Sequence, residues 1–288
     1  MTETNSRPPA WITGAAGLVG NYLVETAPRF APGWRVQGLT RAQLDLLDFD
    51  AVRRAFQEQR PQLVIHCAAV SRSPAAQANP DLTWRINTDA TAHLARLAAE
   101  IPFVFFSSDL VFDGLIGNYD ESATPNPLGV YAQTKVAAEK FVLANPRHTV
   151  LRAALNAGAS LTGDRAFNEQ MRLAWQRGAT LRLFTDEFRC PIPAAVTARV
   201  VWELVNQKQA GIFHVAGSER LSRYEIGKLL AARWPQFNPR FEAALAKDYP
   251  NPPRPRDASL SCAKVQSILP FQMPAFSKWL RDHPDELI

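Results

Sequence analysis

The stretch "AWITGAAGLVG", residues 10–20, decides the fold. It begins as a short apolar strand, passes through three glycines spaced G-x-x-G-x-x-G, and continues with helix-forming residues to about Thr26. Such a turn lets the backbone approach a pyrophosphate closely, and the helix N-terminus offers free N–H groups to phosphate. A plain glycine-rich turn is the alternative. In this strand–turn–helix context we predict a dinucleotide site at Gly14, Ala16, Gly17, Leu18, Val19 and Gly20.

The first half of the chain continues this alternation of strands and helices. Strands alternating with helices predict a parallel sheet with helices on both faces, and strands covered on both sides are almost wholly apolar, as these are. We predict an α/β fold, a Rossmann-type doubly wound parallel sheet with a smaller, discontinuous substrate-binding lobe. The core would occupy 1–154, and 155–288 would hold the remaining core elements interleaved with the lobe. The expected strands are 34–40, 62–69, 103–108 and 148–154, and the expected helices are 50–59, 81–100 and 131–144.

The second half has a looser rhythm. The stretch from Pro235 to Arg256 is rich in proline and asparagine, so we expect it to be mostly irregular and to lie in the smaller lobe. Its "PNPPRPR" could instead be a polyproline ligand, the less favoured interpretation. The expected helices here are 166–178, 191–205 and 222–234, with strands at 180–184 and 211–217.

Composition excludes several classes of protein. The 288 residues are 47% hydrophobic and 20% charged, enough for a full core. The net charge of +5 is scattered, which argues against a nucleic-acid partner and suits an anionic small molecule. The three cysteines lie far apart, so no disulfide framework or metal site is indicated. Without an 18-residue apolar stretch or a signal pattern in residues 1–10, we expect no membrane partner and a cytoplasmic location.

The stretch "GVYAQTK", residues 129–135, places Tyr131 and Lys135 one helical turn apart. A nearby ammonium lowers the pKa of a phenol, which would tune Tyr131 as a proton donor. Alone the pair is weak support, because chance Tyr-x-x-x-Lys spacings are common and a polar patch on a helix has the same pattern.

With the glycine turn, the chain resembles the extended short-chain dehydrogenase/reductases. Serines end the strand "FVFFSS", Tyr131 follows Ser108 by 23 positions, and Asn87 matches an asparagine on the preceding helix. The resemblance implies that Tyr131 donates a proton, Lys135 binds the nicotinamide ribose, and Ser108 binds the carbonyl oxygen. Asn87 would support Lys135 through a bound water.

The same resemblance implies further cofactor contacts. "VIHCAAVS" (64–71) resembles the segment beneath the nicotinamide ribose, and "QLDLLDFDAV" (43–52) resembles the segment that touches adenine. These and the strand ends add Asp45, Leu46, Cys67, Ala68, Ala69 and Ser107 to the expected cofactor site.

A closer resemblance is to the dTDP-4-dehydrorhamnose reductase branch. It rests on "SSDLVFDGLIGNYDESATPNPLGVYAQTKVAAE" (107–139) and, more loosely, on segments of the second half. Ile192 and "LRAALNAG" (151–158) depart from that branch on the substrate side, so the resemblance implies a keto-sugar nucleotide without fixing the sugar. The expected substrate contacts are Asp109, Phe167, Asn168 and Arg256.

The resulting hypothesis is an NAD(P)H-dependent oxidoreductase that reduces a keto group on a nucleotide-activated sugar, with a homodimer as one option. No acidic residue occurs from Trp34 to Gln43, and Arg41 lies beside Thr40 at the end of the second strand. We therefore expect NADP(H) to be preferred and NAD(H) to be possible. Two alternatives stay open: an NAD-dependent nucleotide-sugar epimerase of the same fold, and a non-catalytic NADP-binding regulatory subunit like that of methionine adenosyltransferase. We assign His66 and His214, each in an apolar strand, no catalytic role.

Overall fold

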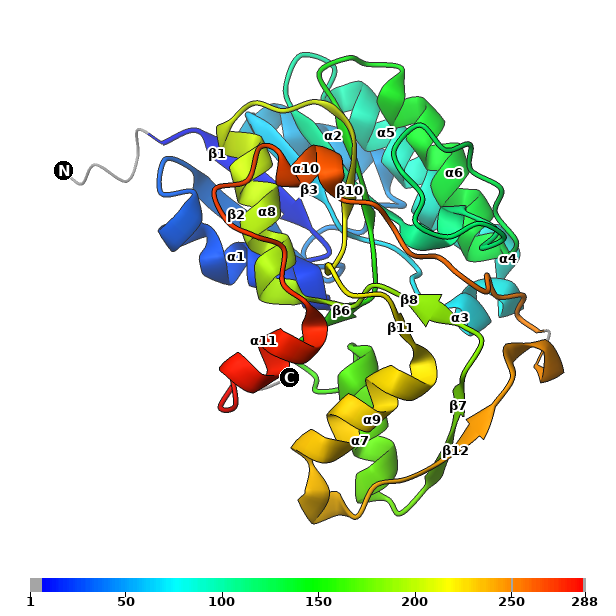
Figure 1. Cartoon of the computed structure of the whole chain (residues 1–288). Helices are drawn as coiled ribbons and strands as arrows, with labels where there is room; N and C mark the ends of the chain where they lie inside the picture. Colours follow the sequence, from blue (N-terminus) through cyan, green and yellow to red (C-terminus); the bar gives the residue numbers. More distant parts are fainter. Residues whose placement is uncertain (1–6, 250, 287–288) are drawn as a thin grey trace.

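A computed structural model describes residues 7–249 and 251–286. Residues 1–6, part of the segment in which we expect no signal sequence, and Pro250 of the proline-rich stretch lie outside the described residues. The centre of the molecule is a six-stranded, wholly parallel sheet in the order β10-β5-β4-β3-β1-β2 (Figure 1). Its strands are β1 (Pro9–Thr13), β2 (Arg35–Leu39), β3 (Leu63–His66), β4 (Phe103–Ser108), β5 (Thr149–Ala153) and β10 (Gly211–Val215).

The strand order reverses beside β1. The chain passes from β1 to β2 on one side and then to β3 on the other, so β1 pairs in parallel with both. In open α/β sheets a ligand-binding crevice forms outside the carboxyl ends of the strands at such a reversal. The predicted fold class, a Rossmann-type parallel sheet, is confirmed.

Helices cover both faces of the sheet (Figure 1). Successive strand residues point to opposite faces; Ile12 accordingly packs in one buried cluster with α1 and α8, and Trp11 in another with α2, α5 and α6. Both faces of the central strands β3, β4 and β5 are therefore buried, which explains why these strands are nearly all apolar, whereas the edge strand β2 is partly exposed. The covering helices are α1 (Leu18–Phe30), α8 (Ala194–Asn206), α2 (Phe49–Gln59), α5 (Ala90–Leu97) and α6 (Val130–Leu143).

A smaller lobe lies below the carboxyl ends of the strands, with its own apolar cluster around Trp175 and Phe276 (Figure 1). Its helices come from separate parts of the chain, because α8 and β10 return to the main sheet between them. The lobe also contains a parallel strand pair that links the stretch we expected to be irregular to a distant segment. The lobe elements are α7 (Phe167–Gln176), α9 (Arg223–Arg233), α11 (Phe276–Asp282), β7 (Thr180–Phe184) and β12 (Arg240–Ala244).

The expectation that 235–256 is mostly irregular therefore missed β12. The reason is that β12, with the sequence RFEAA, is largely exposed and carries no apolar run. The helix expected at 81–100 is also divided, with a π-helical turn, η2 (Arg85–Asp89), in its middle. The remaining elements are α3 (Ser73–Ala78), α4 (Pro80–Trp84), η3 (Asp109–Val111), β6 (Asn156–Ala157), β8 (Phe188–Arg189), β9 (Ile192–Pro193), β11 (Leu221–Ser222), η4 (Pro235–Phe237), η5 (Ala246–Asp248) and α10 (Ala263–Gln266).

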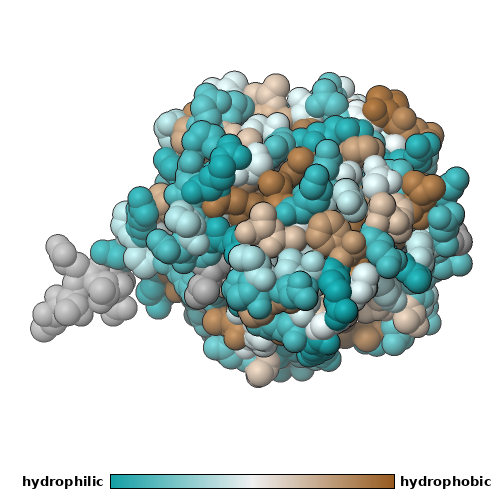
Figure 2. All heavy atoms as spheres, turned by 60° about the horizontal axis from the view of Figure 1, so that its bottom comes forward, coloured by the Kyte–Doolittle hydropathy of each residue, from teal (hydrophilic) through white to brown (hydrophobic). Residues whose placement is uncertain are grey.

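The outer surface on the lobe side is mostly hydrophilic, with apolar side chains in small scattered groups (Figure 2). Within residues 7–249 and 251–286, no helix has the length and apolar character needed to cross a bilayer.

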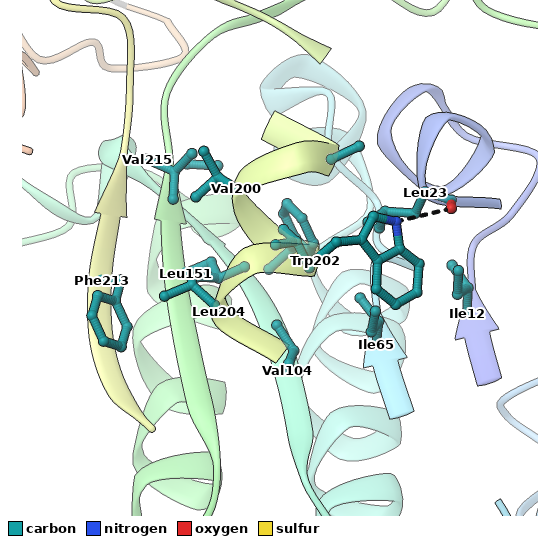
Figure 3. Close-up of a cluster of buried hydrophobic side chains, with 14 of the residues drawn as sticks. Ile12, Leu23, Ile65, Val104, Leu151, Val200, Trp202, Leu204, Phe213 and Val215 are labelled. Atoms are coloured by element: carbon teal, nitrogen blue, oxygen red, sulfur yellow. Dashed lines mark hydrogen bonds between the residues drawn. The ribbon is translucent and has the colours of Figure 1, made fainter. Parts of the chain in front are cut away.

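One tryptophan joins the two helices of the first face. Trp202 on α8 is fully buried, and its indole Nε1 donates a hydrogen bond to the backbone oxygen of Leu23 on α1, 3.2 Å away (Figure 3). Around it pack side chains from β1, β3 and β4, including Ile12, Ile65 and Val104. Helix α8 therefore holds α1, and with it the glycine turn, against the sheet.

We predict that Trp202→Ala lowers the free energy of unfolding by about 3–5 kcal/mol, since it removes a large buried side chain and leaves a cavity. Urea unfolding followed by circular dichroism measures this change. Trp84→Ala is the control, because Trp84 is 38% exposed, and we expect it to cost less than about 1 kcal/mol. Equal losses in the two variants would contradict the role given to Trp202.

Candidate active site

The glycine turn after β1 packs directly on the loop after β3. Gly14 has a positive φ of 70°, and a Cβ at this position would lie 2.7 Å from the backbone nitrogen of Ala68. A Cβ at Gly20 would lie 2.3 Å from the carbonyl oxygen of Gly14, so this glycine lets α1 start close to the turn. Two of the three glycines are therefore required by contacts within the protein itself.

Gly17 is different. Apart from its two neighbours in the chain, the one described group within 4 Å of a Cβ at Gly17 would be the carbonyl oxygen of Gly14, at 3.1 Å. Gly17 is also the N-cap of α1, and it has no side chain that could accept from the first N–H groups of the helix. Open space beside an uncapped helix N-terminus fits the pyrophosphate of a dinucleotide. The neighbouring Ala16 is exposed, and Leu18 and Val19 are half-buried.

The carboxyl end of β2 carries the residues expected at the adenosine end of the cofactor. Thr40 donates from its backbone nitrogen and its hydroxyl to Gln43 Oε1, both at 2.9 Å. Arg41 is 75% exposed in its side chain, and its Nη2 lies 3.5 Å from Asp45 Oδ2. The turn after β2 therefore places the carboxylate of Asp45 next to Arg41, although β2 itself contains no acidic residue. Leu46 packs on the apolar cluster of that face.

Lys135 is buried beneath Tyr131. Its Nζ donates to the carbonyl oxygen of Phe106 on β4 at 2.7 Å and lies 4.5 Å from the centre of the Phe105 ring. Burial lowers the pKa of Lys135 to about 8, so the ammonium is still mostly charged at neutral pH. The ammonium lies 5.9 Å from the centre of the Tyr131 ring.

The expected lowering of the Tyr131 pKa by Lys135 is wrong for this structure. Burial of the phenol raises its pKa to about 12, and Ser108 acts in the opposite direction through a hydrogen bond. The charge of Asp109 raises this pKa further and that of Arg189 lowers it. At neutral pH the phenol is therefore protonated, which is the form that a proton donor needs.

Two consecutive serines end β4, and their side chains leave on opposite faces. The Ser107 hydroxyl donates to Glu139 Oε1 at 2.5 Å, and Glu139 in turn forms a buried ion pair with Arg152 at 2.8 Å. The Ser107 side chain therefore belongs to a buried network, and only its backbone is left for the expected cofactor contact.

The Ser108 hydroxyl donates to Asp109 Oδ1 at 3.1 Å and accepts from the backbone nitrogen of Leu110 at 3.2 Å. Asp109 is fully buried, and its two carboxylate oxygens accept from Arg189 Nη2 and Nε, both at 2.6 Å. Burial raises the pKa of Asp109, and the guanidinium beside it opposes that rise. Both carboxylate oxygens of Asp109, which we expected to contact substrate, are thus bonded to Arg189. Sequence reasoning missed Arg189, because 80 positions separate the pair and no local pattern marks it.

Asn87 lies in the π-helical turn η2. Its Oδ1 accepts from the backbone nitrogen of Val70 at 2.8 Å, and its Nδ2 donates to Thr134 Oγ1 at 3.0 Å. Asn87 therefore joins the loop after β3 to Thr134, the residue before Lys135, and its expected support of the lysine through a bound water stays a prediction. A π-turn inside a helix is common at functional sites.

His66 links three elements of the core. Its Nδ1 lies 2.6 Å from Thr13 Oγ1 and its Nε2 lies 3.0 Å from Thr91 Oγ1, so it joins β1, β3 and α5. Burial lowers the pKa of His66 to about 3, which keeps the ring neutral. His214 is likewise buried, with Nδ1 3.0 Å from the backbone oxygen of Tyr119. Cys67, Ala68 and Ala69 follow β3 and are half-buried beside the glycine turn.

The other residues expected to contact substrate differ in their burial and in their contacts. Asn168 is fully buried, and its amide both donates to and accepts from the backbone of Gly158, at 2.9 and 3.1 Å. Phe167 belongs to the apolar cluster of the lobe. Only Arg256 has an exposed side chain. Among the described residues, no three His, Cys, Asp or Glu side chains are grouped closely enough to hold a metal ion.

The sequence model of one protein family, described as the RmlD substrate binding domain, matches residues 10–287. The chain is 30% identical to the probable low-salt glycan biosynthesis reductase Agl14 of Haloferax volcanii, over 92% of this chain and 93% of that protein. It is 28% identical to methionine adenosyltransferase 2 subunit beta of Bos taurus, over 89% of this chain and 81% of that protein. A solved dTDP-4-dehydrorhamnose reductase from Bacillus anthracis, in complex with NADP, shares the fold, with a TM-score of 0.87, 23% identity, and 96% and 98% of the two chains covered.

The unequal surroundings of the glycines generate a prediction. Gly17→Ala should leave the chain folded but weaken NADPH binding at least about tenfold, since the methyl group enters the space left for pyrophosphate. Gly20→Ala, the matched control, should instead lower stability by about 1–3 kcal/mol, because its methyl group meets backbone. Thermal unfolding and titration of NADPH fluorescence separate the two effects. Unchanged NADPH affinity in folded Gly17→Ala would show that this glycine has no part in binding.

Proposed function

Because this chain belongs to the RmlD substrate binding domain family, within the extended short-chain dehydrogenase/reductases, we propose that it is an NAD(P)H-dependent reductase of a keto group on a nucleotide-activated sugar. One observation carries the proposal. The Tyr131 phenol, the Ser108 hydroxyl and the buried Lys135 ammonium meet at the carboxyl end of β4, beside a glycine turn with space for a pyrophosphate.

Each residue has a distinct task in this proposal. When bound, the dinucleotide supplies the hydride that reduces the carbonyl carbon. Tyr131 donates its phenolic proton to the alkoxide oxygen, and its raised pKa keeps that proton in place until the oxygen becomes basic enough to take it. Ser108 donates a hydrogen bond to the same oxygen as negative charge develops there. Lys135 uses one donor on Phe106 and has two further N–H donors for the nicotinamide ribose.

Two relatives support different versions of the function. The Haloferax volcanii relative is named a reductase, which favours the proposed activity. The Bos taurus relative is a subunit of methionine adenosyltransferase, which keeps a regulatory function as the second candidate. The buried Lys135 and the Tyr131–Ser108 pair favour the reductase, since a purely regulatory cofactor site does not need a proton donor. An epimerase would use the same residues but oxidise no NADPH overall.

The test is to mix the purified protein with NADPH and dTDP-4-dehydrorhamnose, and with other keto-sugar nucleotides. Oxidation of one NADPH for each product molecule indicates the reductase. Product without net oxidation indicates an epimerase. Tight NADPH binding without any product in the whole set would overturn the proposal in favour of the regulatory function.

Tyr131→Phe should lower kcat at least about a hundredfold with little change in NADPH affinity, since it keeps the ring and removes the proton donor. Tyr224→Phe is the control: Tyr224 lies on α9 with its ring against Phe241, and we expect its kcat to match that of the unaltered protein. Steady-state rates and NADPH titrations provide both measurements. Turnover of Tyr131→Phe within tenfold of the starting value would rule out Tyr131 as the acid.

We also propose a preference for NADPH over NADH that is modest. The Bacillus anthracis reductase of the same fold was solved with NADP. In this chain Arg41 is exposed at the end of β2 and could bind the additional phosphate, but Asp45 lies within 3.5 Å of it. That carboxylate partly neutralises the guanidinium and could itself accept from a ribose hydroxyl, which is why we do not expect an absolute preference.

Arg41→Ala should therefore raise the KM for NADPH about tenfold, near the value of one charge-assisted contact, and leave the KM for NADH almost unchanged. The measurement is a pair of steady-state titrations with the two cofactors at a fixed substrate concentration. Arg35→Ala, at the other end of β2 and exposed, is the matched control. Equal effects of Arg41→Ala on both cofactors would mean that Arg41 does not read the phosphate.

A further inference from the structure

Two buried arginine–carboxylate pairs hold the two serines at the end of β4. Ser107 donates to Glu139, which pairs with Arg152, and all of these lie in the main sheet and α6. Ser108 donates to Asp109, which pairs with Arg189. The second pair joins segments that are far apart in the sequence. Asp109 follows β4, whereas Arg189 is on β8, which follows the lobe elements α7 and β7 in the chain.

The backbone of Arg189 is held by a strand that leads into the smaller lobe. Strand β8 pairs antiparallel with β11, where Arg189 is opposite Leu221, and α9 starts directly after β11. The guanidinium reaches Asp109 with two hydrogen bonds of 2.6 Å, the side chain being 9% exposed and that of Asp109 0%. A planar guanidinium that grips a carboxylate with two parallel bonds fixes the direction as well as the distance of its partner.

Asp109 and the backbone of Leu110 together determine where the Ser108 hydroxyl oxygen lies. Without substrate, the one proton of the hydroxyl is donated to Asp109 Oδ1 at 3.1 Å, and the oxygen accepts from the backbone nitrogen of Leu110 at 3.2 Å. Because a hydroxyl proton rotates, it can turn from Asp109 to a bound carbonyl oxygen while Leu110 keeps Oγ in place. A fully buried carboxylate without its cation would tend to become protonated, and it would then compete with Ser108 as a donor. Arg189 therefore keeps Asp109 as an acceptor.

We propose that Arg189 is a positioning residue for the reaction: through Asp109 it holds the Ser108 hydroxyl beside Tyr131. The geometry at the end of β4 then depends on how β8 and β11, which lead into helix α9 of the smaller lobe, pack against it. This inference rests on the proposed reductase function. Asp109 raises the pKa of Tyr131 and Arg189 lowers it, so both members of the pair lie close enough to the phenol to affect its pKa.

A double-mutant cycle tests the inference, using NADPH and the keto-sugar nucleotide that the unaltered protein reduces. Arg189→Lys keeps the charge and loses the two-pronged grip, and it should lower kcat about tenfold with NADPH affinity unchanged. In a Ser108→Ala background the same change should lower kcat less than about twofold, because the group that it positions is gone. Asp109→Asn, which has nearly the same shape, should follow the same pattern and replaces Arg189→Lys if that variant does not fold.

Arg152→Lys is the matched control. It weakens an equally buried pair at the same strand end, but one that holds Ser107, so its effect on kcat should be the same factor with Ser108 present or absent. If Arg189→Lys shows this additive behaviour too, or keeps kcat within twofold of the starting value, the positioning role is overturned.

A crystal structure of Arg189→Lys gives a measurement that does not depend on turnover. We expect Ser108 Oγ to leave Asp109 or to occupy more than one rotamer, and an unchanged Ser108–Asp109 hydrogen bond would overturn the inference. If the unaltered protein reduces no keto sugar, the proposed function fails, and the Ser108 rotamer still decides the positioning role.

Discussion

The close approach of the turn after β1 to the loop after β3 is the constraint on which the site depends. Gly14 lies so near the backbone of Ala68 that no side chain fits between them. The two loops meet at the place where the strand order reverses, so this contact brings the helix N-terminus of α1 and the residues after β3 to one edge of the sheet. Asn87 extends the same contact to α6 by binding Val70 and Thr134, which places Tyr131 and Lys135 on that edge as well.

The sequence alone was sufficient to predict those elements that depend on a local pattern of residues. Apolar runs of strand length, the glycine spacing and the helical spacing of Tyr131 and Lys135 each reflect a backbone requirement within about 15 residues, and the structure has the corresponding elements. Strand β12 was missed because its sequence has no apolar run typical of a strand, and it is recognised as a strand only from its pairing with β7. The division of the chain at residue 154 stays a prediction.

The electrostatics of the site could not be predicted in the same way. A spacing of four residues places two side chains on one helix face, but it does not say where a flexible lysine directs its ammonium. In the structure Lys135 Nζ bonds to Phe106, so burial alone dominates the Tyr131 pKa. The cation that does influence the phenol, Arg189, is distant in the sequence and comes from β8, so only the assembled fold brings it to the site.

The burial of these charges itself bears on the choice between an enzyme and a regulatory subunit. A buried ion pair stabilises a fold weakly at best, because desolvation offsets most of the attraction, and well-packed apolar residues often do as well. Binding a dinucleotide needs the glycine turn but neither a buried ammonium near a phenol nor a guanidinium paired with the carboxylate beside Ser108. Strongly perturbed groups that meet in a cleft are typical of sites that move protons. The arrangement of Ser108 at the end of β4 with Tyr131 and Lys135 on α6 therefore supports the proposed reaction over cofactor binding alone.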